Sequence, residues 1–255
     1  MSKGKALYEV LKDRLRKYYR PAIYRDLKQT KENRKQFYRS FLKQRSLVFD
    51  VGANMGNRIE PLAELGMKVV AFEPQSACYQ FLKLKFRNKA IILNTALGSK
   101  KGEAVIHLNS ESSTIASMSG DWIKSVKEGR FSKGEWSQTE RVKTDTLDQM
   151  IDIYGIPEFI KIDVEGFEAE VLRGLTHQVP MISFEYTIPE QTSSVLECIG
   201  LIAGISSAYT FNYAIGEQNH FALPEWITAD AIKTLLNENP LQFDGFGDIY
   251  ARLIK

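Results

Sequence analysis

Acidic and glycine residues follow an apolar run of the chain in an order that could hold a ligand. The run Leu47-Val48-Phe49 passes into residues 50–56, Asp-Val-Gly-Ala-Asn-Met-Gly, which we call the glycine turn. Gly52 and Gly56 have no Cβ, so the backbone can turn sharply there and approach a ligand closely. Asp50 adds a carboxylate that can hold a cationic amino group. The glycine turn therefore predicts a binding site at the end of a buried strand.

A second carboxylate stands where it could bind a sugar ring. Glu73 ends the next apolar run, where a carboxylate can accept both ribose hydroxyls of an adenosine. The ribose of NAD would be bound by a carboxylate at the same distance after Gly52, so Glu73 alone does not distinguish the two ligands. A strand–helix turn that holds no ligand is the plainer alternative. Ala53 and Asn54 interrupt the G-x-G-x-x-G pattern that carries a pyrophosphate. Asp50 would repel phosphate but suits a methionyl ammonium, so the pattern favours S-adenosyl-L-methionine.

A third acidic group could act on a bound hydroxyl. Asp163 and Glu165 follow one later apolar run, and Glu185 ends another. Carboxylates two residues apart at a strand end can point to one side. Asp163 or Glu165 could take the hydroxyl proton, orient the acceptor, or hold a divalent cation that acidifies it; we assign no metal ligand. Glu185 is a further candidate for substrate contact, whereas Glu168 could simply stabilise a helix N-terminus.

The elements that must position these groups alternate along the chain. Such alternation implies a parallel sheet with helices on both faces, and ligands bind such sheets at the carboxyl ends of the strands. An extra strand near 104–108 could pair with 141–143, and the polar stretch 110–138 is too long for a simple connection, so we expect a functional or flexible loop. We expect main strands near 47–49, 69–72, 90–93, 159–164 and 181–185, helices near 58–65, 76–87, 147–154 and 167–173, and then a helix near 190–202, strands near 208–213 and 219–223, a helix near 229–237 and a strand near 246–252.

The first 45 residues differ in charge from the rest of the chain. They hold fifteen Lys and Arg but four Asp and Glu, a net charge of +11, whereas residues 46–255 carry −8. Helices are expected at 5–20 and 22–43, interrupted by Pro21. We therefore divide the chain into a basic helical N-terminal arm, 1–45, and a main domain, 46–255. The arm could touch anionic lipid, a phosphorylated substrate, nucleic acid or the acidic domain; a packed or solvated helical pair is the alternative.

Composition excludes several classes of protein. The sequence has no apolar stretch near the roughly 20 residues of a membrane-spanning helix. We expect no secretory signal, because its first residues run into charged sequence without an apolar segment. Its two cysteines are far apart, which fits reduced thiols. We expect a cytoplasmic protein, with peripheral membrane attachment through the arm left open. A Ser-His-Asp arrangement with a nucleophile elbow is missing, which disfavours a hydrolase.

Taken in order, the motifs resemble those of the FkbM-type methyltransferases over about residues 46–187. They are the glycine turn, Phe72-Glu73-Pro74, Asn94-Thr95-Ala96-Leu97-Gly98, Thr146-Leu147-Asp148 and Lys161-Ile162-Asp163-Val164-Glu165-Gly166. The resemblance implies the Rossmann-like class I methyltransferase fold, a seven-stranded, mostly parallel sheet flanked by helices. It also implies S-adenosyl-L-methionine as donor and O-methylation of a sugar, glycolipid or secondary metabolite.

The resemblance also implies roles for individual residues. The sequence departs from the family at Ile59, where a Thr or Ser is common, so a hydroxyl contact to the cofactor carboxylate is missing or replaced. By resemblance, Asp50, Gly52, Asn54 and Gly56 contact the methionyl part, Glu73 with Pro74 beside it contacts the ribose, and Ala96 and Leu97 border the adenine. Asp163 lies beside the reacting centre and also counts among the cofactor-binding residues.

Three alternatives stay open at this point. The basic arm could serve a nucleic-acid methyltransferase, although no Asn-Pro-Pro-Tyr or Pro-Cys motif supports one. An NAD(P)-dependent oxidoreductase and a non-catalytic interaction module would keep the same fold. The leading expectation is an enzyme whose partner is a carbohydrate or small molecule with a free hydroxyl. The sequence does not set the oligomeric state.

Overall fold

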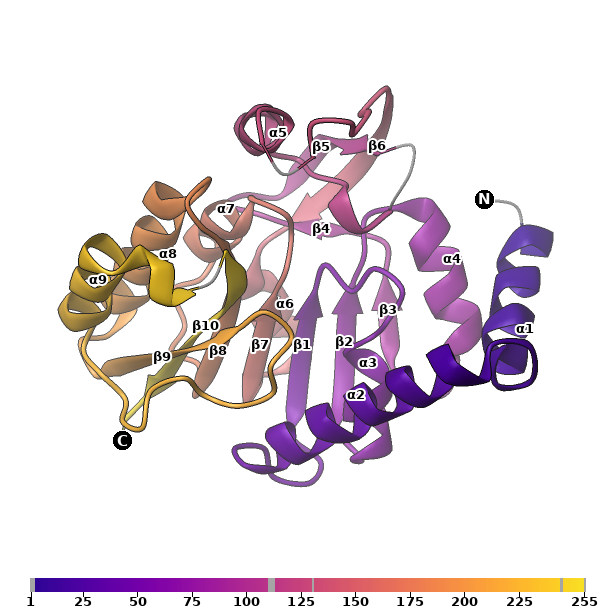
Figure 1. Cartoon of the computed structure of the whole chain (residues 1–255), viewed down its shortest axis with the longest axis horizontal. Coiled ribbons are helices and arrows are strands. Elements are labelled where there is room, and N and C mark those ends of the chain that lie inside the picture. The colour runs from indigo at the N-terminus through magenta and orange to yellow at the C-terminus, as the bar shows by residue number, and fades with distance from the viewer. Residues whose placement is uncertain (1–2, 110–112, 130, 244, 255) are drawn as a thin grey trace.

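The computed structural model describes residues 3–109, 113–129, 131–243 and 245–254. Its main sheet has seven strands in the order β3-β2-β1-β7-β8-β10-β9 (Figure 1). β10 runs antiparallel to β8 and β9, and the other neighbours are parallel. This sheet confirms the α/β class I methyltransferase fold. The strands are β1 Leu47–Val51, β2 Lys68–Phe72, β3 Ile91–Leu93, β7 Phe159–Ile162, β8 Met181–Thr187, β9 Tyr209–Ile215 and β10 Phe246–Leu253.

Helices cover both faces of the sheet. Alternate residues of a strand point to opposite faces, and here both sets are apolar and need to be buried. Val48 of β1 joins one buried core, and its neighbours Phe49 and Val51 join the other. With both faces buried, the strands are apolar throughout, as the sequence predicts. The first core includes residues of α2 Pro21–Arg39, α3 Ile59–Glu64 and α4 Ser76–Lys85, and the second includes residues of α6 Leu147–Tyr154, α7 Glu168–Arg173, α8 Thr192–Ile205 and α9 Ala229–Glu238.

The order of the strands creates a crevice beside β1. From β1 the chain builds outward through β2 and β3, and from β7 it builds the other way through β8. The connections on the two sides of β1 therefore diverge, and parallel α/β sheets bind ligands at such a switch point. Asp50 near the end of β1, Glu73 after β2 and Asp163 after β7 all lie at this edge.

A smaller sheet lies over that edge in the view of Figure 1. Its order is β4-β6-β5, from β4 Ala96–Leu97, β5 Gly102–Leu108 and β6 Gln138–Asp145. The predicted pairing of the extra strand with 141–143 is confirmed, since Ala104 lies opposite Val142.

The stretch 110–138 is more ordered than the loop we expected, although residues 110–112 and 130 lie outside the described ones. It contains a 3-10 turn, η1 Ser113–Ile115, and the helix α5 Gly120–Lys127, whose N-terminus is capped by the Ser119 side chain. The helix forms because Trp122, Ile123 and Val126 bury one of its faces.

The arm packs against the main domain. Its helices are α1 Lys3–Tyr19 and α2, and Pro21 begins α2 rather than kinking a longer helix. Asp13 pairs with Lys85 of α4 at 2.8 Å. Lys31 pairs with Glu60 and Glu64 of α3, at 3.1 and 2.7 Å. Acidic residues of the domain therefore neutralise part of the arm's charge.

The expected strand at 219–223 is wrong. Phe221 instead packs edge-on against Phe37 of the arm, with ring centroids 4.9 Å apart. Asn212 holds the neighbouring backbone, since its side chain accepts from the Leu223 N–H and donates to the Leu223 carbonyl. Side-chain packing and these local hydrogen bonds take the place of a strand. No helix of the described residues has both the length and the apolar character needed to cross a membrane.

Candidate active site

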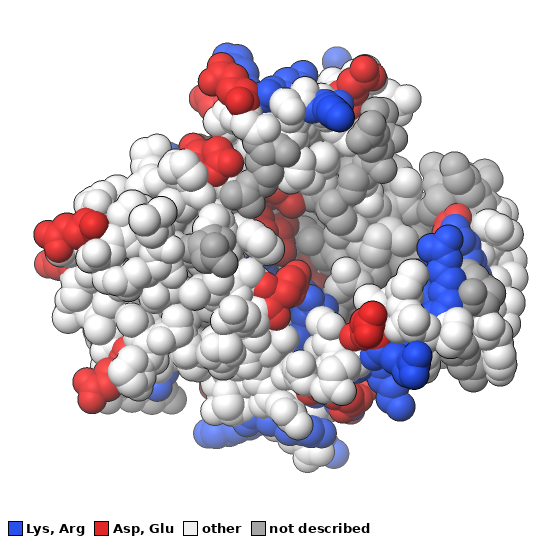
Figure 2. Space-filling model, in the orientation of Figure 1, with Lys and Arg blue, Asp and Glu red and all other residues white. Residues whose placement is uncertain are grey.

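A cavity opens at the carboxyl ends of β1, β2, β7 and β8 and collects most of the predicted site residues. Figure 2 shows this face hollowed near its middle, with acidic atoms inside the hollow and basic atoms beside them. Gly56 does not line the cavity. The predicted residues that do line it are Asp50, Gly52, Asn54, Glu73, Pro74, Ala96, Leu97, Asp163, Glu165 and Glu185.

The two glycines of the glycine turn serve packing within the protein. Both have positive φ, +83° at Gly52 and +80° at Gly56. A Cβ on Gly52 would lie 1.8 Å from the Asp163 carbonyl oxygen, and one on Gly56 would lie 2.3 Å from the Phe86 ring. Their missing side chains let the turn approach the end of β7 and helix α4. Packing within the protein therefore accounts for both glycines, and their contact with a ligand stays a prediction.

Glu73 is held in place by the glycine turn itself. Its carboxylate accepts hydrogen bonds from the backbone N–H groups of Asn54, at 2.7 Å, and Gln75, at 2.8 Å. Burial raises the pKa of Glu73 to about 7. Each carboxylate oxygen retains a second lone pair, so Glu73 can still accept from a ligand hydroxyl.

Asp50 is buried without full hydrogen bonding. It is only 2 % exposed, and its Oδ2 has no hydrogen-bond partner among the described residues. Burial raises the pKa of Asp50 to about 6, although the charges of Arg58 and Lys161 oppose the rise. A buried acceptor without a partner is costly unless a ligand donates to it. The ammonium of an amino acid would meet that need.

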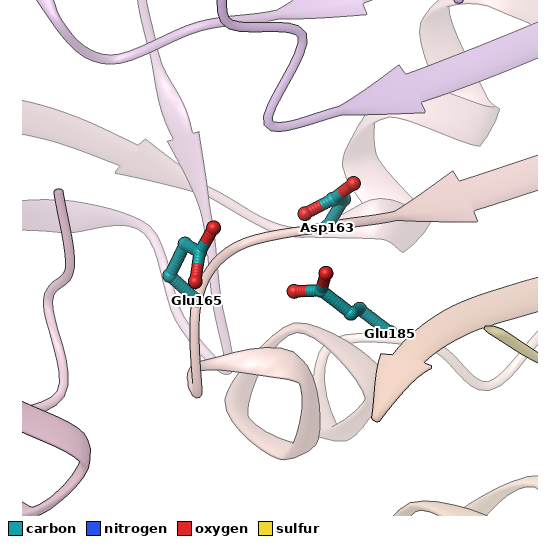
Figure 3. A group of neighbouring side chains, drawn as sticks. All are labelled: Asp163, Glu165 and Glu185. Atoms are coloured by element: carbon teal, nitrogen blue, oxygen red, sulfur yellow. The ribbon is translucent and has the colours of Figure 1, made fainter. Parts of the chain in front are cut away.

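The side chains of Asp163, Glu165 and Glu185 point toward one another (Figure 3), and all three line the cavity. Asp163 follows β7, Glu165 lies in the turn after it, and Glu185 belongs to β8. Oxygens of the three carboxylates lie within 4.8 Å of one another, a spacing at which they could share a metal ion. We refer to them as the acidic trio.

A buried lysine stabilises the ionised form of Asp163. Lys161 Nζ lies 2.7 Å from Asp248 Oδ1 and 3.3 Å from Asp163 Oδ2. Burial alone would raise the pKa of Asp163, but the charges of Lys161 and Arg58 outweigh it and lower the pKa. Burial and the Asp163 charge raise the pKa of Glu185 well above its usual range. Of these two neighbouring carboxyl groups, Glu185 therefore holds a proton more tightly than Asp163 does.

Glu168 serves the backbone next to the acidic trio. It lies in the first turn of α7, where its Oε1 accepts from the N–H groups of Val164 and Gly166, at 3.1 and 3.2 Å. Burial raises its pKa to about 7. Glu168 thus holds the turn that carries Glu165 and lies in the first turn of the helix, where the sequence suggested a structural role for it.

Sequence reasoning missed several residues of the cavity wall. Arg58 lies two residues after the glycine turn, and its position could have suggested a ligand contact. Arg34 and Glu217 gave no signal, because they are 183 residues apart and meet only when the arm docks. The backbone carbonyl of Ser113 accepts from the side chains of Asn54 and Gln75, so η1 closes one side of the cavity.

Fold and site together define a methyltransferase-like α/β domain with an acid-lined cavity at its switch point. The model of the methyltransferase FkbM domain matches residues 50–225. That match spans well over half of the 255 residues, and the chain therefore belongs to the FkbM methyltransferase domain family.

Solved structures resemble the chain only distantly. A TehB-like SAM-dependent methyltransferase from Corynebacterium glutamicum ATCC 13032 Kitasato has 7 % identity and a TM-score of 0.45, covering 87 % of this chain and 88 % of that one. A putative O-methyltransferase from Klebsiella pneumoniae has 10 % identity and a TM-score of 0.44, covering 89 % and 80 %. The plantazolicin methyltransferase BpumL with SAH has 9 % identity and a TM-score of 0.42, covering both chains fully. These likenesses are too weak to assign a ligand or a substrate. A comparison with curated proteins gave no match.

Proposed function

We propose that the chain transfers a methyl group from S-adenosyl-L-methionine to a hydroxyl of a sugar, glycolipid or secondary metabolite. The observation that carries the proposal is the acidic trio at the mouth of a cavity that also contains Asp50 and Glu73. Family membership supports methyl transfer, and the arrangement of carboxylates supports a hydroxyl acceptor.

The charges of the cavity suit S-adenosylmethionine better than NAD. Asp50 offers a buried acceptor for an ammonium, and Glu73 offers one for ribose hydroxyls. Carboxylates outnumber cationic side chains on the described wall, so a pyrophosphate would meet repulsion while a sulfonium would be favoured.

The acidic trio can manage the proton that leaves the acceptor. S-adenosylmethionine, when bound, supplies an electrophilic methyl group. Asp163, kept ionised by Lys161, accepts the hydroxyl proton as the oxygen–methyl bond forms and the sulfur–methyl bond breaks. Protonated Glu185 holds the Asp163 carboxylate by a hydrogen bond, and Glu165 orients the acceptor across the gap.

A divalent cation is the second arrangement that the acidic trio allows. Three carboxylates within 4.8 Å could hold Mg²⁺ or Mn²⁺, and the cation would lower the pKa of a bound hydroxyl. Turnover that resists a chelator supports Asp163 acting as a base. Turnover that is lost with the chelator and restored by Mg²⁺ supports the metal.

The proposed activity can be tested by transfer of a labelled methyl group. The protein is incubated with methyl-labelled S-adenosylmethionine and host extract, which is then fractionated into glycan, lipid, small molecules, RNA and protein. We expect label in the glycan, lipid or small-molecule fraction, and none with Asp163→Asn. Label confined to RNA or protein would contradict the proposed acceptor class.

We also propose that the arm attaches the enzyme to an anionic membrane surface. On α1, exposed apolar side chains recur at helical spacing, and α2 continues them. Arg20, Arg25 and Lys28 are exposed nearby and complement anionic lipid. The exposed large apolar residues are Leu7, Tyr8, Leu11, Leu15 and Tyr18 of α1 and Ile23, Tyr24 and Leu27 of α2.

Vesicle flotation tests the membrane proposal. Removing the whole arm is unsuitable, because Phe37 and Tyr38 belong to the core. A double variant, Leu11→Ser with Leu15→Ser, alters only exposed positions, and Ile153→Ser is a matched control on α6. We expect wild type and control to float with phosphatidylserine vesicles but not with phosphatidylcholine, and the double variant to lose flotation. Equal flotation of the double variant would refute the proposal.

A further inference from the structure

Arg34 connects the arm to the cavity. It lies on α2 and is 8 % exposed, and its guanidinium lines the cavity wall. Nη1 donates to the Asn57 carbonyl at 3.4 Å, and Nη2 pairs with the Glu217 carboxylate. The Nε of Arg34 is buried with no hydrogen-bond partner among the described residues. An unsatisfied buried donor in a cavity wall points to a ligand acceptor.

Arg58 completes a pair of guanidinium groups. Its Nη2 lies 3.5 Å from Glu217 and 3.8 Å from Asp248. Arg34 and Arg58 are the only cationic side chains among the described residues that line the cavity. A ligand carboxylate therefore has one favourable place to bind, on the same wall that contains the buried Asp50 acceptor.

Glu217 places a carboxylate against both guanidinium groups. It follows β9 in the chain, and its side chain is 57 % exposed, so it can swing toward solvent at little cost. A guanidinium group can bind a carboxylate through two parallel, charge-assisted hydrogen bonds, which are among the strongest that side chains form. Glu217 thus marks the position that a ligand carboxylate would take.

We propose that Arg34 and Arg58 bind the carboxylate of the methyl donor and that Glu217 competes with that carboxylate for them. This inference rests on the proposed donor, S-adenosylmethionine. Asp50 then binds the ammonium group of an α-amino acid, and the two arginines bind its carboxylate. Ile59, fully buried in the core, supplies no hydroxyl here, and its neighbour Arg58 provides the contact instead. The arm becomes part of the donor site.

Two donors that differ only in the carboxylate test the proposal. S-adenosylmethionine and its decarboxylated form are titrated calorimetrically into wild type, Arg34→Met and the control Arg39→Met, an exposed position of the same helix. We expect Arg34→Met to weaken S-adenosylmethionine about 10- to 100-fold and to leave the decarboxylated form within about threefold. Arg39→Met should change neither. Equal weakening of both donors, or of neither, would overturn the assignment.

Glu217→Gln tests the competition without touching the core. The substitution frees both arginines, so we expect S-adenosylmethionine to bind about three- to tenfold more tightly, with no change for the decarboxylated form. Unchanged or weaker binding of S-adenosylmethionine would refute competition. Because Glu217 is exposed, this variant remains informative if Arg34→Met fails to fold. Wild type that binds neither donor would instead refute the proposed function, so the two failures are distinguishable.

Discussion

At the scale of single residues, the charge of Asp163 depends on its neighbours rather than on its own position in the chain. Lys161 and Arg58 lower its pKa, whereas burial and the charge of Asp163 raise the pKa of the neighbouring Glu185. The sequence placed an acid at the end of a strand but could not assign its charge state, because Asp248 and Glu185 come from distant segments.

Replacing Asp163 by Asn should separate chemistry from binding. Donor affinity should change by less than about threefold, because the donor contacts assigned above belong to other residues, whereas kcat should fall about 10²- to 10⁴-fold with the loss of the base. Calorimetry gives the first quantity and single-turnover methyl transfer the second. Equal loss of both would reassign Asp163 to donor binding.

Glu73 and Asp50 predict how donor binding depends on pH. Their pKa values are raised to about 7 and about 6, and hydroxyl and ammonium groups bind the ionised carboxylates. Affinity should therefore rise from about pH 5.5 to about pH 7.5, where the donor's own amino group begins to lose its proton.

Variants of Glu73 assign the upper part of that profile. In Glu73→Gln the rise near pH 7 should vanish while the rise near pH 6 remains, as seen by titration across the range. Glu73→Ala should weaken binding strongly at every pH. A profile for Glu73→Gln identical to wild type would contradict the assignment.

At the scale of elements, the turn between β7 and α7 is fixed by one buried acid. Glu168 accepts from two backbone N–H groups of that turn, and Ser117 donates its hydroxyl to the Glu165 carbonyl at 2.6 Å. Gly166 lies against Trp122 of α5, so that a Cβ there would collide with the indole. The turn that carries Glu165 is thus positioned by α7, Ser117 and α5 together.

Glu168 should make the free energy of unfolding depend on pH. Its folded pKa of about 7 exceeds the ordinary 4.5, so the folded chain holds the proton more tightly than the unfolded chain. Stability should fall as pH rises from about 4.5 to about 7, by at most about 3 kcal/mol from this group. Denaturant unfolding at about pH 5 and pH 7.5 should show a smaller decline in Glu168→Gln. The same decline in both proteins would be the contrary result.

Local pattern predicted the main elements, and tertiary contacts decided what it missed. The apolar runs that become β1, β2, β7 and β8 are evident in the sequence because both faces of each strand are buried. The helix α5 was missed because its apolar residues are few and lie among polar ones. The expected strand at 219–223 failed because Phe221 packs against the arm.

At the scale of the whole molecule, arm and domain meet at one site. The sequence suggested a separate basic arm of 45 residues, and that division stays a prediction. Phe37 and Tyr38 of the arm nevertheless lie in a core with β1 residues, and Arg34 reaches the cavity. Contacts between segments so far apart in the sequence could not be predicted from it. The glycine turn and Glu73 could be predicted as site residues, because each follows a recognisable apolar run.

A ligand titration tests the central claim, that the cavity between β1 and β7 binds S-adenosylmethionine. S-adenosylmethionine and NADH are each titrated calorimetrically into wild type and Glu73→Ala at about pH 7.5. We predict one site per chain for S-adenosylmethionine, strong weakening in Glu73→Ala, and no heat from NADH. Binding of NADH in preference to S-adenosylmethionine, or S-adenosylmethionine binding unaffected by Glu73→Ala, would contradict the claim.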